Sequence, residues 1–481
     1  MNDLLVQRGR ALESQSKTVT AYRFDVPAGT EALTLTFDYG PRESRDATHN
    51  LPLIERAFDK HIARRRASLG PDGVAQHRKA LAIDERAKVL ANLMNVVIVD
   101  PRGRWRGRWD RLPAANSSEL VLAPEAASRG FVPGAIEPGS GTAAVECHGV
   151  FGAPVDYELR VIARPRPSDA ELTALEETRY AEPPRGAGGP GWYFGELHSH
   201  SSHSDGKHEL AEIADRAARA GLDFLAMTDH NAMSAHPVAP GAPVVIVPGF
   251  ELTTFHGHHP IYGLDHVIPW HVDGRVVPLA ELAPRIRAAG GLIGVAHPFV
   301  PGDPLCTGCR MVDGLPPDAF DMMEVWYRRW TTPGSDNQAA YEMWDRLWQT
   351  GNGRTGVAAR DWHGPEQEAP FPGEYPLTGV FAASSTPEAI LAGLRAGRAI
   401  MSRGPIVDLS RAGEGGLVIR VERMLGPAEL RVLFAGGAVI DRRPLRADAV
   451  VELEVTRPGA IRAELWDGED PVVLTNHVTV R

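Results

Sequence analysis

Histidine and acidic residues occur in short clusters along the middle of the chain, and these residue types can hold a divalent metal ion. His198 and His200 are two residues apart, so on a β-strand both imidazoles would point to the same side. Asp205 follows in a polar segment that ends at Gly206, which is typical of a loop. Two imidazoles on one face with a carboxylate nearby can bind a metal ion, provided that other segments supply further ligands.

Further residues of these types follow successive apolar runs. The apolar runs are typical of buried strands and cover residues 222–228, 243–247, 291–296 and 355–359. The metal-ligand types that come directly after them are His230, Glu251, His297, Asp361 and His363. Helical patterns lie at 208–220, 278–290, 337–350 and 387–397. The alternation predicts an α/β fold with its chemistry at the carboxyl ends of the strands, where barrel enzymes carry their sites.

The order of these motifs resembles the PHP domain, named after polymerases and histidinol phosphatase. The shared motifs are H-x-H, S-D-G, T-D-H, G-x-E, A-H-P and D-x-H, and they fall within residues 191–405. The resemblance implies a distorted (β/α)7 barrel that binds two or three metal ions. Within the family, the chain most resembles the group of carbaryl hydrolase and McbA. The residues that carry this finer likeness are Gly257-His258, the segment from Leu394 to Arg398 that leads to Gly404-Pro405, and Leu474-Thr475-Asn476.

The resemblance also implies a ligand set. One metal ion would take His198, His200, Glu251 and Asp361, and a second would take Asp205, His230 and His363. Glu251 would bridge to a neighbouring position that includes His297. Mixed carboxylates and imidazoles suit Zn, Mn or Fe. Family members with three ions carry a further His or Cys between the last two motifs, and residues 321–326 have neither, so we expect two ions and leave a third open.

Three residues are candidates for direct catalytic roles. Arg360 stands where the family often has Ser, and its side chain could hold a phosphate or carboxylate group. It could equally form a salt bridge behind the strand, because neighbouring strand residues face opposite ways. His258 could line the pocket or act as an acid or base, and either His258 or His297 could donate a proton to a leaving group.

These residues predict a metal-dependent hydrolase, and a phosphoesterase is the first hypothesis for its activity. Bound metal ions lower the pKa of water to about 7 and so supply a nucleophile at neutral pH. The substrate would be a small, anionic molecule. The same site could instead cleave a carbamate, ester or amide, which the likeness to carbaryl hydrolase favours. A third interpretation is a non-catalytic binding module with a vestigial site.

Composition excludes several other classes. The formal net charge is −10, which argues against an extended nucleic-acid surface and against a polybasic membrane contact. The first 17 residues lack the apolar core of a signal peptide, and we find no apolar run of membrane-spanning length. We therefore expect a cytoplasmic enzyme and leave its oligomeric state open. Cys306 and Cys309 form a C-x-x-C pair that could be half a zinc site, a redox pair or two inert thiols.

Composition shifts divide the chain into four parts. Short strand patterns with Gly and Pro turns predict a β-rich, sandwich-like domain over residues 1–163, with a helical insertion at about 43–95. Residues 164–190 are rich in Pro, Gly and Arg and are interpreted as a linker. The PHP-type barrel is expected over 191–405, and alternating runs predict a second β-rich domain over 406–481.

Overall fold

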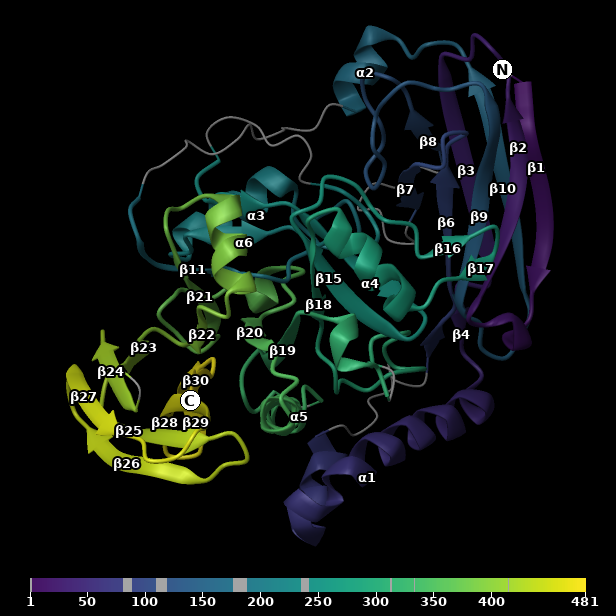
Figure 1. Cartoon of the computed structure of the whole chain (residues 1–481). Helices are drawn as coiled ribbons and strands as arrows, with labels where there is room; N and C mark the ends of the chain where they lie inside the picture. Colours follow the sequence, from purple (N-terminus) through teal and green to yellow (C-terminus); the bar gives the residue numbers. More distant parts are fainter. Residues whose placement is uncertain are drawn as a thin grey trace.

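The computed structural model shows a central α/β region with β-rich parts on two sides of it (Figure 1). It describes residues 2–80, 89–109, 119–175, 188–234, 242–311, 314–332, 334–413 and 415–481, without the side chains of 64–80. In these ranges, we find no helix with the length and apolar character needed to cross a membrane.

The N-terminal part contains two antiparallel sheets that share one core. The first sheet has the order β1 (Asn2–Ala11), β10 (Val155–Arg164), β3 (Ala32–Gly40) and β8 (Glu119–Leu122). The second has the order β2 (Thr18–Val26), β9 (Gly139–Gly149), β6 (Leu93–Val99) and β7 (Trp105–Trp109). Phe24, Leu35 and Val145 come from both sheets and are buried against one another, as in a β-sandwich.

A long helix, α1 (Ala47–Ala80), occupies most of the segment interpreted as a helical insertion. Two short strands, β4 (Glu43–Ser44) and β5 (Leu90–Ala91), pair at its base. Ile54 and Phe58 of the helix pack with Leu90 in a small apolar cluster that also contacts Leu305 of the central region. The insertion is thereby attached to the central region as well as to its own domain.

The segment interpreted as a linker is partly structured. Strand β10 runs on to Arg164, and helix α2 (Asp169–Leu175) follows it. Leu172 of this helix is buried against Ala123 and Ala126, so the helix packs on the N-terminal part. The rest of the expected linker, residues 176–187, lies outside the described residues.

The central region is a mixed α/β structure. One group of strands has the order β13 (Val245–Val247), β12 (Phe224–Ala226), β11 (Gly191–Glu196), β21 (Leu377–Ala382) and β22 (Ala399–Ser402). The other has the order β14 (Gly249–Thr254), β15 (Gly257–Tyr262), β18 (Leu292–Val295), β19 (Met322–Tyr327) and β20 (Thr355–Ala359). The helices are α3 (Leu210–Arg219), α4 (Leu279–Ala288), α5 (Asn337–Gln349) and α6 (Pro387–Arg395), which agree with the four predicted helical patterns.

Strand pairing among the described residues does not form a closed ladder, so closure of a (β/α)7 barrel is not confirmed. The two groups adjoin at Pro248, between β13 and β14, and again at β20. There the Thr378 hydroxyl bonds both the N–H and the carbonyl of Ala358, at 2.9 and 2.8 Å. Side-chain hydrogen bonds therefore connect the two groups where the structure shows no backbone ladder.

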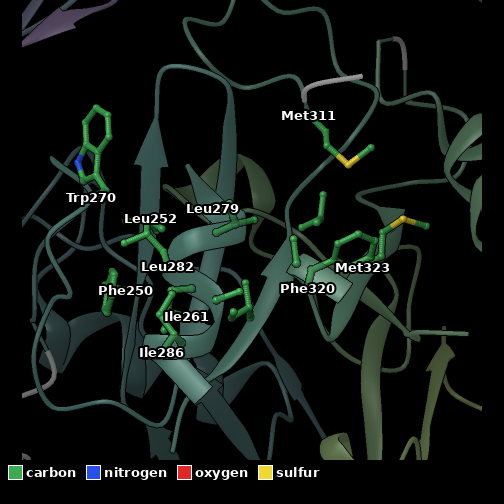
Figure 2. Close-up of a cluster of buried hydrophobic side chains, with 14 of the residues drawn as sticks. Phe250, Leu252, Ile261, Trp270, Leu279, Leu282, Ile286, Met311, Phe320 and Met323 are labelled. Carbon is green, nitrogen blue, oxygen red and sulfur yellow. The ribbon is translucent and has the colours of Figure 1, made fainter. Parts of the chain in front are cut away.

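Helix α4 shows how sequence spacing produces the core of this region (Figure 2). Leu279, Leu282 and Ile286 recur at helical intervals and form one apolar face. That face packs toward Phe250 and Ile261, which point from strands β14 and β15 into the same buried cluster. The helix is fixed against the strands that carry part of the polar site described below.

The C-terminal strands are continuous with the central region, because β29 pairs with β22. They comprise β25 (Ala428–Phe434), β26 (Val439–Leu445), β28 (Gly459–Asp467), β29 (Asp470–Thr475) and β30 (Val478–Val480). A separate three-stranded sheet contains β23 (Ile406–Ala412), β24 (Gly416–Glu422) and β27 (Ala449–Glu454). A small hairpin, β16 (His271–Val272) with β17 (Arg275–Val276), extends from the central region beside β2.

Asn476, just after β29, connects the C-terminal part to both groups of central strands. Its side chain accepts a hydrogen bond from the Gly356 N–H at 2.7 Å. It also donates to the carbonyls of Gly356 and Ala399, each at 2.9 Å. The side chain thus satisfies three backbone groups of β20 and β22 in the interior.

Replacing Asn476 by Ala should destabilise the fold. The change leaves three buried backbone groups without their partners, so the free energy of unfolding should fall by roughly 2–4 kcal/mol. Urea denaturation followed by tryptophan fluorescence measures this loss. Asn352→Ala is the control, because that side chain is exposed and bonds only within its own loop. Equal midpoints for the two variants would show that the Asn476 contacts do not support the fold.

Candidate metal centre

The candidate ligands converge because loops after neighbouring strands lie side by side. His198 and His200 follow β11, and Asp361 and His363 follow β20. Backbone hydrogen bonds of 2.9 Å connect these two loops, from the His200 N–H to the Trp362 carbonyl and from the Trp362 N–H to the His198 carbonyl. The H-x-H motif and the D-x-H motif are therefore held side by side beyond the ends of their strands.

A first set of donors surrounds Asp361 and Glu251. The Asp361 Oδ1 atom lies 3.2 Å from His198 Nε2 and 3.1 Å from His200 Nε2. Glu251 Oε1 is 3.2 Å from His198 Nε2. Ligand atoms about 2.0–2.2 Å from one zinc ion lie roughly 3 Å apart, so these separations fit a shared metal ion.

A second set surrounds Asp205. Its Oδ1 atom is 3.1 Å from His363 Nε2 and 3.6 Å from His230 Nε2. His200 belongs to the same group of possible ligands. The structure thus brings together the residues expected for each of the two metal ions, with His200 between them.

Glu251 also has donors on its other sides, including His258. His258 Nδ1 lies 3.2 Å and His297 Nε2 lies 3.7 Å from Glu251 Oε1. Glu251 Oε2 is 2.7 Å from His230 Nδ1. His258 therefore stands among the possible ligands, whereas the sequence indicated only a pocket or acid–base role. A ligand for a third metal ion was expected between the A-H-P and D-x-H motifs, at residues 321–326. His258 lies before the A-H-P motif, so that expectation did not include it.

The chemistry of the buried atoms fits metal ions. Both Glu251 carboxylate oxygens are fully buried, and their near neighbours among the described residues are imidazole nitrogens; Nε2 of His198 and of His200 faces carboxylate oxygens in the same way. An isolated buried charge is costly in free energy, and a metal ion is one of the few partners that offsets this cost. The candidate ligands form four overlapping donor sets, and within each set the ligand atoms lie within 4.8 Å of one another.

Two acidic residues that the sequence interpretation did not use hold the ligands in place. Glu324 on β19 contacts His198 Nδ1 at 2.7 Å with one oxygen and accepts the His297 N–H at 2.6 Å with the other. A carboxylate on the far nitrogen of an imidazole ligand fixes its orientation and tautomer. Asp229 accepts hydrogen bonds from the backbone N–H and hydroxyl of Ser201, both at 2.8 Å, and so shapes the loop after His200.

Mutual electrostatics keeps these side chains charged. Burial acts to raise the pKa of Asp205, but His363 and His230 outweigh it and hold that pKa well below its usual value. Burial acts to lower the pKa of His363, but Asp205 and Asp361 outweigh it and raise this pKa to about 9. A metal ion competes with the imidazole proton for the same nitrogen, so metal affinity at His363 should weaken as pH falls below this value.

Arg360 does not line the cavity, which argues against its candidate catalytic role as a phosphate contact. Its side chain is fully buried, with Nη1 donating to the Ala369 carbonyl at 3.0 Å and Nε 3.7 Å from Glu196 Oε2. Glu196 also accepts the Arg360 N–H at 3.0 Å. Arg360 lies just past the end of β20 and is not among the residues that line the cavity, whereas Asp361 and His363 are. The alternative salt bridge behind the strand is the arrangement that the structure shows.

The donor cluster forms the floor of a cavity of about 800 Å³. Asp205, His230, His258, His297, Asp361 and His363 line it on the polar side. Tyr327 and Arg328, which follow from β19, form a neighbouring wall. Phe58, Leu90 and Leu305 give an apolar wall, to which the N-terminal part contributes. The cavity can take a molecule with a charged group at the floor and an apolar body beside α1.

Cys306 and Cys309 lie on the rim of the same cavity and are joined by a disulfide. Of the three alternatives given above, a disulfide is compatible with a redox pair; it differs from two inert thiols and leaves no thiolate for a zinc ion. The remaining cysteine, Cys147, is free and buried in the N-terminal part.

Comparisons with known proteins agree with the motifs. The family model of the PHP domain matches residues 196–271, which include five of the expected ligands and His258. A search of curated proteins finds no significant match. The match shows a likeness to the PHP domain over residues 196–271, while the likeness to the carbaryl hydrolase group is not confirmed.

Three solved structures are similar to parts of the chain. A two-domain protein from Bacteroides vulgatus, containing a predicted PHP-like metal-dependent phosphoesterase, is 15% identical over 63% of this chain and 100% of its own, with a TM-score of 0.36. A protein named as a metal-dependent phosphoesterase from Bifidobacterium adolescentis is 13% identical over 44% and 96%, with a TM-score of 0.28. An amidohydrolase from Chromobacterium violaceum is 16% identical over 36% and 89%, with a TM-score of 0.28.

The purified protein should contain at least two equivalents of divalent metal, because two complete donor sets are present. Elemental analysis of protein prepared without chelators measures this content. His200→Ala should lower it, since His200 belongs to both sets, whereas His266→Ala should not, since His266 is exposed and pairs with the exposed Asp265. Active protein with less than about one equivalent of all transition metals would contradict the assignment.

Glu324→Gln should weaken metal binding without removing a ligand. The amide cannot carry the negative charge that faces His198 Nδ1, so we expect affinity to fall roughly 10–100-fold. Competition with a chromogenic chelator measures the change. Glu366→Gln is the matched control, because Glu366 forms an exposed ion pair with Lys207 at 2.9 Å. The same affinity in both variants would mean that Glu324 does not support the metal ligands.

Proposed function

We propose that this chain is a metal-dependent phosphoesterase. The observation that carries the proposal is the convergence of carboxylate and imidazole side chains at one point: Asp205, His230, His297, Asp361 and His363 line a cavity, and the fully buried Glu251, His198 and His200 belong to the same donor groups. His198, His200 and Asp361 would hold one ion, joined by Glu251, whose Oε1 lies 3.2 Å from the same His198 nitrogen, and Asp205, His230 and His363 would hold a second. Glu251 with His258 and His297 offers a third position, so the donor count supports two ions with room for another.

Bound divalent ions would supply an activated water molecule at neutral pH and positive charge opposite the developing anion. The residues of the chain would position these ions and keep bulk water from the floor of the cavity. Burial lowers the pKa of His297 to about 3, so this imidazole stays neutral at pH 7, as a metal ligand must. His258 faces the cavity beside it and is the better candidate for delivering a proton to the leaving group.

The electrostatics of the floor favours an anionic substrate. Two or three divalent ions among the carboxylates and imidazoles would present several exchangeable positions to the oxygens of a phosphate group. The apolar wall at Phe58, Leu90 and Leu305 fits an organic leaving group. We therefore propose a small phosphate ester with an apolar alcohol portion as the substrate.

The apolar wall also supports a second candidate. A carbamate, ester or amide carries no charge in its ground state and could occupy the same wall while its carbonyl carbon meets the activated water. The donor set serves both reactions, because metal ligands by themselves do not determine the bond that is cleaved. A binding module with a vestigial site is the weaker proposal, since the donor sets are intact and five of the expected ligands line the cavity.

A panel of three substrates tests the proposal: an aryl phosphomonoester, an aryl phosphodiester and an aryl ester or carbamate. His198→Ala and Asp361→Ala should each lower turnover more than about 100-fold, because each loses a ligand to a shared metal ion. Circular dichroism should stay unchanged. His266→Ala should keep full activity, since His266 lies on the surface. Turnover of the neutral substrate alone would replace the phosphoesterase proposal with the second candidate, and a loss below tenfold would contradict the metal assignment.

A further inference from the structure

Arg328 occupies an unusual backbone position at the end of β19, on the wall of the cavity. Its φ angle is 56°, in the left-handed region that side chains other than glycine rarely adopt. Such conformations cost free energy and persist where the surroundings impose them, often beside functional sites. The adjoining residue Tyr327 ends the strand and lines the same cavity.

Asn337, the first residue of α5, holds this turn in place. Its side chain accepts the Tyr327 N–H at 2.8 Å and donates to the Tyr327 carbonyl at 3.0 Å. It also donates to the carbonyls of Arg329 and Trp330, each at 3.1 Å. The side chain is buried, so these bonds are shielded from water. The turn is therefore built by the neighbouring helix, and the left-handed residue within it is fixed.

The side chain of Arg328 is anchored on one side only. Nε donates to the Arg360 carbonyl at 3.1 Å, and Nη2 donates to Asp361 Oδ2 at 3.2 Å. The guanidinium group lies 4.8 Å from the centre of the Tyr327 ring. Nη1 has no hydrogen-bond partner in the described part of the chain, and 28% of the side chain is exposed. A planar cation is thus held beside a metal ligand with donors left over.

Arg108 is the other arginine among the described residues that line the cavity. Unlike Arg328, it is buried and its charge is paired with a buried carboxylate. Its Nε atom lies 3.1 Å from the buried carboxylate of Glu146, and its side chain is 2% exposed. Glu146 also contacts His271 at 3.0 Å, so this cluster joins the N-terminal part to the central region. Arg108 is accounted for by that structural network, which leaves Arg328 as the better-placed cation for a ligand.

We propose that Arg328 binds a non-bridging oxygen of the substrate phosphate and so selects anionic over neutral substrates. Arginine suits this role because its fork of N–H donors matches the oxygens of a phosphate group and its charge does not titrate. Arg328 lines the cavity whose floor carries the metal ligands, and 28% of its side chain is exposed. The proposal rests on the phosphoesterase function and assigns to Arg328 the contact that Arg360 cannot make.

Arg328→Ala is compared with Arg329→Ala on an aryl phosphate and on the acetate of the same phenol. Arg329 is the matched control, because it is the next residue, is 54% exposed and pairs with Glu374 on the surface. Removing one charged donor should lower kcat/KM for the phosphate about 100-fold. Activity toward the acetate should change less than about threefold, and Arg329→Ala should leave both unchanged. Asp361 keeps its 2.8 Å hydrogen bond from Tyr327, so metal content should stay the same.

A binding measurement separates this inference from the phosphoesterase proposal. Titration calorimetry with inorganic phosphate should show at least tenfold weaker binding to metal-loaded Arg328→Ala than to the native protein. If the native enzyme cleaves no phosphate ester but Arg328→Ala still loses phosphate binding, the proposed function fails while the anion contact stands. Native phosphate turnover with unchanged phosphate binding in the variant would overturn the inference alone.

A structural role for Arg328 would give a different pattern. Equal losses on the phosphate and the acetate, or a loss of metal ions, would place Arg328 as support for Asp361 and overturn the proposal. If Arg328→Ala does not fold, Arg328→Lys provides the test, since it keeps the charge but not the planar fork. The proposal requires that this variant bind phosphate at least about threefold more weakly than native protein while its metal content is unchanged; native-like phosphate binding by Arg328→Lys would overturn it.

Discussion

The rest of the structure depends on the burial of Glu251 among imidazoles. Its carboxylate is completely excluded from solvent, and His198, His230 and His258 approach its two oxygens at 2.7–3.2 Å. A buried charge of this kind is strongly destabilising unless partners surround it closely. Burial acts to raise the pKa of Glu251, but the three imidazoles outweigh it and hold this pKa well below its usual value. The fold must therefore deliver histidines from several strands to one point.

The parts outside the central region help to position these histidines. The Trp105 indole of the N-terminal part donates to the Asn231 carbonyl at 3.0 Å, next to His230. The Gly130 N–H donates to His203 at 3.1 Å, in the loop after His200. From the other side, Asn476 connects β20 and β22, and β20 leads directly to Asp361. The flanking strands thus restrain the loops that carry the metal ligands, and the N-terminal part also forms a wall of the cavity.

Arg328 and Arg360 show how backbone geometry assigns different roles to the same residue type. Arg360 follows β20 and turns behind it, where Nη1 donates to the Ala369 carbonyl and the guanidinium forms a 3.7 Å ion pair with Glu196. Arg328 follows the neighbouring strand, but its left-handed backbone directs it to the cavity wall, where it meets Asp361. Both guanidinium groups therefore lie next to the loop that carries Asp361. The Arg360 group lies behind the strand, and the Arg328 group lies on the cavity wall.

The sequence by itself determined the α/β alternation, the four central helices and the identity of the metal-ligand types, because apolar periodicity and the order of the motifs are local properties. Only the tertiary structure placed His258 beside Glu251, Glu324 behind His198 and Arg328 on the cavity wall. These contacts join residues 7–126 positions apart in the chain, or depend on one backbone angle, and no local pattern records either. It also turned Arg360 away and joined the C-terminal strands to β22, since strand direction and sheet pairing are set by long-range packing.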